Sequence, residues 1–120
     1  MRAETIATPA PAPPPAPRGF AARLERALLG LAGGHGRIVA HRERSWASIT
    51  FAGTRHTLRI AFDTPEAIDS GEALIARLPD HEFAFPGRLA ADAAVNAVDH
   101  AMEPAPQLTV ICELLVLEDG

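Results

Sequence analysis

Apolar residues recur with helical spacing in two segments of the chain. Residues 19–31 carry one apolar stripe, made of Phe20, Leu24, Leu28 and Leu31. This spacing predicts an amphipathic helix, which Gly33 and Gly34 end. A second helix is predicted over residues 64–78, because Thr64 is a favourable N-cap and Pro65 suits the first helical turn.

Residues 37–51 and 54–62 are rich in β-branched and aromatic residues and predict two strands of a hairpin. Gly53-Thr54 is the expected tight turn, since glycine readily adopts positive φ. This turn pairs apolar residues on one face, Ile49 with Leu58 and Ala47 with Ile60. On the other face it pairs Trp46 with Ala61 and Arg44 with Asp63.

The last third of the chain predicts a second hairpin. Residues 108–117 alternate apolar and polar positions, as a half-buried strand does. Residues 89–102 are rich in alanine, which favours helix. A strand there, paired with 108–117 across a loop at 103–106, would instead place apolar residues on one face and polar residues on the other. We therefore predict a strand, with Val95 opposite Leu114. The same pairing places Asn96 opposite Glu113 and His100 opposite Thr109.

Together these elements predict an α+β fold of helix, β-hairpin, helix and β-hairpin. Both helices would lie on one face of a mainly antiparallel four-stranded sheet. Residues 81–85 would extend the third strand. Residues 1–17 read as a disordered Pro/Ala-rich tail, and residues 18–120 as a single domain.

Composition narrows the classes of protein. The chain has 120 residues, of which 48% are hydrophobic and 22% charged, so as a whole it is not disordered. No apolar run is long enough to span a bilayer, and the N-terminus lacks the apolar core of a signal peptide. All eleven cationic residues are Arg, which is typical of a GC-rich bacterial genome. We expect a bacterial, cytoplasmic protein that does not bind membranes.

The charge is divided between two halves of the chain. Residues 1–62 carry nine Arg and three acidic residues, whereas residues 63–120 carry two Arg and twelve acidic residues. The division falls between the first hairpin and the second helix. It indicates two halves that attract each other, within one fold or across a dimer.

The candidate chemical groups are sparse. A metal could be shared on a helix by Asp92, Asn96 and His100. On a strand, however, residues i and i+4 lie about 13 Å apart, which is too far for one metal ion. We therefore predict no metal site and no cofactor. His100 and Glu113 could form an acid/base pair across the second hairpin. No nucleophile accompanies them, because Cys112 falls in an apolar alternation and is expected to be a buried, inert thiol.

The sequence therefore favours a small, non-enzymatic protein-interaction or assembly module. One sheet face would be left uncovered and would carry several apolar residues, namely Trp46, Val98, Ile111, Leu115 and Leu117. Such a face indicates a protein partner or self-association, for instance as a homodimer.

Two other interpretations stay open. The Arg-rich first hairpin could bind nucleic acid, with Arg44, Arg59 and Trp46 on one face of the sheet. Alternatively, His100, Asn96 and Glu113 could bind a small ligand or act in an enzyme.

Overall fold

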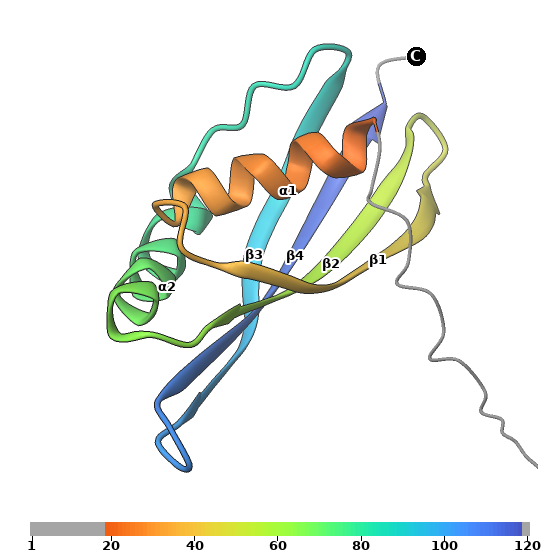
Figure 1. Cartoon of the computed structure of the whole chain (residues 1–120). Helices are drawn as coiled ribbons and strands as arrows, with labels where there is room; N and C mark the ends of the chain where they lie inside the picture. Colours follow the sequence, from red (N-terminus) through yellow and green to blue (C-terminus); the bar gives the residue numbers. More distant parts are fainter. Residues whose placement is uncertain (1–18, 119–120) are drawn as a thin grey trace, which may run out of the picture.

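The structure, a computed structural model, describes residues 19–118. Figure 1 shows its elements, which are α1 (Phe20–Leu31), β1 (Arg37–Ala47), β2 (Ala52–Phe62), α2 (Pro65–Arg77), the short 3-10 helix η1 (Leu78–Asp80), β3 (Arg88–Ala101) and β4 (Gln107–Glu118). The predicted α+β class is confirmed. The tail predicted for residues 1–17 lies outside the described residues.

The four strands form one antiparallel sheet in the order β1-β2-β4-β3, so β2 and β4 are central. Both helices pack on the same face, as predicted, and α1 crosses in front of the strands in Figure 1. We call this the helix face. The opposite side is the open face, because neither helix covers it.

Alternation along the two central strands builds the core. Their even-numbered residues point to the helix face, where they are buried: His56, Leu58, Ile60 and Phe62 on β2, and Leu108, Val110, Cys112, Leu114 and Val116 on β4. The helices add five more buried residues, which are Leu24, Leu28, Ala67, Gly71 and Leu74. Full burial of each large apolar side chain stabilises the fold by about 1.5–3 kcal/mol.

The first hairpin turns earlier than predicted. Ala47 pairs with Ala52, so the turn is formed by residues 48–51. The backbone N–H of Phe51 donates to the hydroxyl of Ser48 at 3.1 Å, which closes this turn. Gly53 instead lies inside β2, where a Cβ would overlap the carbonyl oxygen of Val116. This glycine allows β2 to approach β4 closely, and the sequence pattern alone reads it as a turn residue.

The corrected turn changes the partners but keeps the faces. Leu58 pairs with His41 on β1 rather than with Ile49, a shift by an even number of residues. Side chains alternate with a period of two, so an even shift leaves each residue on its predicted side. The predicted pair of Arg44 with Asp63 is wrong, because Asp63 instead forms an ion pair with Arg37 at 2.9 Å.

The second hairpin confirms a strand in the Ala-rich segment, since β3 spans Arg88–Ala101. Val95 pairs with Cys112 rather than Leu114, a difference of two residues from the predicted register, and His100 pairs with Leu108 rather than Thr109, a difference of one. Two bulges interrupt β3, at Ala91 and Asn96, and β1 has one at Val39.

The bulge at Asn96 moves the residues that follow it to the opposite face. Val98 and His100 were expected on the open face. They instead pair with Val110 and Leu108, whose side chains point to the helix face. A bulge leaves no mark in a pattern made mostly of alanine, so the sequence could not show this change.

The prediction that residues 81–85 extend the third strand is wrong. This segment has no regular structure apart from an isolated bridge of Phe85 with Arg88, across a turn that contains Gly87 at φ 77°. Phe83 and Phe85 pack against the edge of the core. The ring of Phe85 meets that of Phe20 edge-on, with 4.9 Å between centroids. The alternation of Phe83 and Phe85 along the sequence therefore reflects burial within a loop and not a strand.

The predicted helix ends are confirmed. The Thr64 hydroxyl accepts a hydrogen bond from the Ala67 N–H at 3.0 Å, which caps α2. Gly33 and Gly34 both have φ of 88° after α1, and the Gly34 N–H donates to the carbonyl of Leu29. Within residues 19–118, no helix is long and apolar enough to cross a membrane.

Gly71 of α2 allows the helix to lie directly on the sheet. A Cβ there would be 2.6 Å from Leu108 Cδ2 and 2.7 Å from Phe62 Cδ2, and both of these side chains are buried.

We predict that Gly71→Ala lowers the free energy of unfolding in urea by about 1–3 kcal/mol through overpacking. Gly30→Ala is the matched control, because α1 has open space there, and it should stabilise by about 0.5–1 kcal/mol. Equal effects of the two substitutions would contradict this packing.

Cys112 lies fully buried on β4, and burial raises the pKa of its thiol to about 12. Only the thiolate is reactive, so the folded protein should not react with Ellman's reagent at about pH 8. One thiol per chain should react once urea unfolds the protein. Rapid modification of the folded chain would show that this part of the core opens.

Candidate functional site

Six residues were predicted as site residues from the sequence, and three of them lie together on the open face of the first hairpin. Arg44, Trp46 and Arg59 all point to this face, as their register with Arg55, Gly53 and Ala40 requires. Arg44 and Arg59 are exposed, and Trp46 is half-buried.

The other three predicted residues do not meet. Glu113 is on the open face and pairs with Ala94, Asn96 is an exposed bulge residue, and His100 is exposed on the other side of the sheet opposite Leu108. Leu108, the partner of His100, lies five positions from Glu113 along β4, which is about 17 Å on a strand. The predicted acid/base pair of these two residues therefore does not form. Glu113 instead forms an ion pair with Arg55 at 3.5 Å.

The register of the sheet arranges the open face in rows that run across all four strands. One row contains Arg44, Arg55, Leu115 and Asp92 in spatial order from β1 to β3. The next contains Trp46, Gly53, Leu117 and Leu89. A third, towards the other end of the strands, contains Ala40, Arg59, Ile111 and Ala97.

These rows separate charge across the face. Its basic half, on β1 and β2, carries Arg42, Arg44, Arg55 and Arg59. The acidic half, on β4 and β3, carries Glu113, Asp92 and Asp99. Apolar residues of β4 lie between them, so the charge division seen along the sequence becomes a division between the two sides of one surface.

Large apolar side chains are also exposed where the open face ends at the β1–β2 turn. Ile49, Phe51 and Leu89 are 104%, 54% and 61% exposed. Phe51, Leu89 and Leu117 line a groove of about 670 Å³ between this turn and the start of β3. This apolar end continues the row of Trp46 and Leu117.

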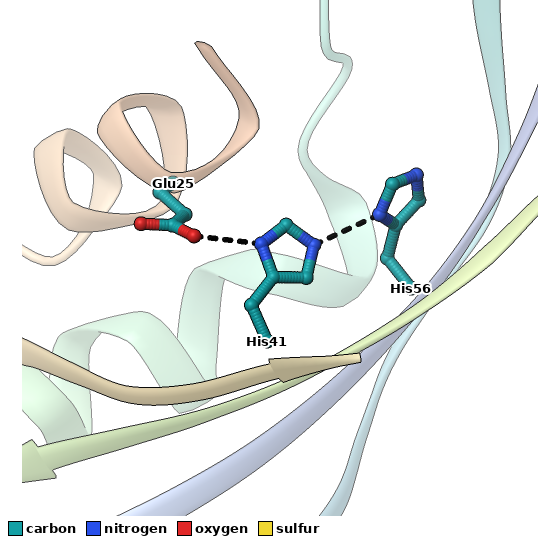
Figure 2. Close-up of polar contacts among 3 residues, drawn as sticks. All are labelled: Glu25, His41 and His56. Carbon is teal, nitrogen blue, oxygen red and sulfur yellow. Dashed lines mark hydrogen bonds and ion pairs between the residues drawn. The ribbon is translucent and has the colours of Figure 1, made fainter. Parts of the chain in front are cut away.

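A separate polar cluster lies on the helix face, and Figure 2 shows it. Glu25 of α1 contacts His41 of β1, with 2.7 Å between Oε2 and Nδ1. The other ring nitrogen of His41, Nε2, is 2.9 Å from Nδ1 of His56 on β2. The three side chains form a chain of hydrogen bonds from the helix to the second strand.

Burial lowers the pKa of one member of this cluster, His56. His56 is 2% exposed, and burial together with the neighbouring His41 lowers the pKa of His56 below 6.5. The Glu25 carboxylate accepts from the His41 Nδ1–H, and the hydrogen bond between the rings uses one proton, carried by either His41 Nε2 or His56 Nδ1. The Phe20 ring lies 5.6 Å from the His56 ring, and the Arg88 guanidinium lies 4.3 Å from the Phe20 centroid.

Sequence reasoning missed this cluster. His41 and His56 lie among the arginines of the first hairpin, and the sequence pattern did not single them out. The expected turn placed His56 opposite Phe51, whereas the actual register places it opposite Glu43. An available signal was the spacing of His41 and Glu43, because residues two apart on a strand share one face.

Comparison with known proteins adds one likeness. The chain matches no protein-family model and no curated protein. Its fold is similar to a chain of the solved virion of a native gene transfer agent (GTA) particle, with a TM-score of 0.54 over 79% of this chain and 87% of that chain. The two are 13% identical, so the likeness shows a shared fold.

Proposed function

We propose that this chain is a small, non-enzymatic protein-interaction or assembly module whose open face binds a second copy of the chain. The observation that carries the proposal is a line of apolar residues along central strand β4 on the open face, which neither helix covers: Ile111 and Leu115 are half-buried, and Leu117 is 9% exposed. Apolar groups at the centre of a surface with charged groups around them are typical of protein interfaces.

The charge pattern supports pairing of two identical faces. A two-fold axis parallel to the strands exchanges the two sides of the sheet. It therefore places the basic half of each copy, with Arg44 and Arg59, against the acidic half of the other, with Asp92 and Asp99. The apolar residues of β4 then meet near the axis. Such an isologous contact satisfies the charges of both copies at once.

The structural neighbour supports an assembly role, because it is a chain of a virion particle. Self-association or a protein partner within such a particle fits the exposed apolar end at Ile49, Phe51 and Leu89, which offers a further contact surface. The bacterial source and cytoplasmic location remain predictions from the sequence.

The first test replaces an apolar residue at the centre of the open face. Leu115→Arg should weaken self-association at least about tenfold, measured by sedimentation equilibrium, because it buries a charge in the proposed interface. Ala76→Arg, on the exposed side of α2, is the matched control and should associate like the unchanged chain. A wild-type chain that stays monomeric at about 0.1 mM would contradict the proposal.

The second test exchanges charges between copies. The Arg44→Glu, Arg59→Glu double variant and the Asp92→Arg, Asp99→Arg double variant should each associate more weakly than the unchanged chain, because like charges then face each other. An equimolar mixture of the two should form a mixed complex, with affinity recovering towards that of the unchanged chain. Failure of the mixture to associate would argue against this arrangement.

A further inference from the structure

Three side chains with metal-binding atoms meet on the helix face near the β1 edge of the sheet. His41 and Glu43 are two residues apart on β1 and so share a face, and His56 lies directly opposite Glu43 on β2. One nitrogen of each ring and one carboxylate oxygen all lie within 4.8 Å of one another. Two paired strands thus bring two imidazoles and a carboxylate to one place.

We propose that His41 Nε2, His56 Nδ1 and the Glu43 carboxylate bind one divalent first-row transition-metal ion, with Zn²⁺ as the reference ion. Imidazole donors favour zinc, nickel, cobalt and copper, whereas magnesium and calcium prefer oxygen donors alone. Two histidines and one carboxylate are an established zinc donor set. This site lies on the opposite side of the sheet from the open face and does not depend on the proposed function.

The distances require only small movements. The two ring nitrogens are 2.9 Å apart, and two zinc–nitrogen bonds at a tetrahedral angle need about 3.3 Å. The rings would separate slightly and turn until both lone pairs point at the ion. Glu43 is exposed, so its carboxylate can turn towards the same point. A cavity of about 110 Å³, lined in part by Glu43 and His56, has room for a water molecule as the fourth ligand.

The proton inventory balances without a further reactant. His41 keeps its proton on Nδ1, where it donates to Glu25, and offers the lone pair of Nε2 to the ion. The proton of His56 leaves Nδ1 and a proton is taken up at Nε2 through solvent, so two neutral rings lose no net proton when the ion binds. The ion then replaces the hydrogen bond between the two histidines.

Glu25 serves as the outer-shell partner of this site. A carboxylate that accepts the second ring N–H of a metal-bound histidine orients the ring and increases its basicity. Glu25 lies 2.7 Å from His41 Nδ1, on a different element. Together with Glu43 it supplies two negative charges against the ion and the nearby Arg88. The bound ion would therefore tie edge strand β1 to β2 and, through Glu25, to α1.

The test is a titration of the full chain with ZnCl₂ by isothermal calorimetry, after treatment with EDTA and buffer exchange. We expect one ion per chain, with micromolar or tighter affinity, and a melting temperature that rises with zinc concentration. Glu43→Gln should lower the affinity at least about tenfold, and Glu25→Gln about 10–100-fold. His41→Gln should abolish binding.

Matched controls are His35→Gln and His100→Gln, since both residues are exposed and outside the cluster. These two variants should bind zinc like the unchanged chain. Absence of one-to-one binding, or equal losses in the control and cluster variants, would overturn the proposal. Glu43 is exposed on an edge strand, so Glu43→Gln should keep the fold and decides the outcome even if His41→Gln unfolds the chain.

Discussion

The structure depends on one constraint, which is that the apolar stripes of two helices must be buried by the same face of one sheet. The central strands β2 and β4 satisfy it with their even-numbered residues, and their pairing sets Leu58 beside Cys112 and Phe62 beside Leu108. Gly71 then permits α2 to approach this surface closely. Because the core occupies the helix face, the remaining apolar residues of β4 have only the open face available.

The same constraint explains the position of the histidine cluster. Edge strand β1 also turns part of its surface to the helix face, and there it presents His41 and Glu43 near the first turns of α1. A polar group removed from water costs free energy unless it finds a partner. Glu25 and His56 supply those partners for His41, so a polar network extends the core where the apolar residues end.

Much of the fold follows from the sequence, because alternation reveals which side of a strand is buried. This is why a strand was predicted for the Ala-rich segment against the preference of alanine, and why Leu58 and Ile60 were assigned to the core. The exact partners could not be predicted. Gly53 resembles a turn residue although it serves a close approach to Val116, and nothing in the sequence marks the bulge at Asn96.

The candidate sites show the same limit. Arg44, Trp46 and Arg59 were grouped correctly on one face, since an even shift in register does not change faces. Glu25, His41 and His56 come from three elements, and their meeting depends on the position of the first turn and on how α1 crosses the sheet. The local sequence pattern predicts neither the position of this turn nor the path of α1 across the sheet.

The bulges in the edge strands have a consequence for how copies of the chain add to one another. A regular, flat edge strand can accept a strand from any neighbour and so seeds open-ended growth of a sheet. Here Val39 interrupts β1, and Ala91 and Asn96 interrupt β3, so both edges are irregular templates. Irregular edges disfavour pairing between strands of neighbouring copies, so the self-association proposed for the open face would not extend into open-ended growth of a sheet.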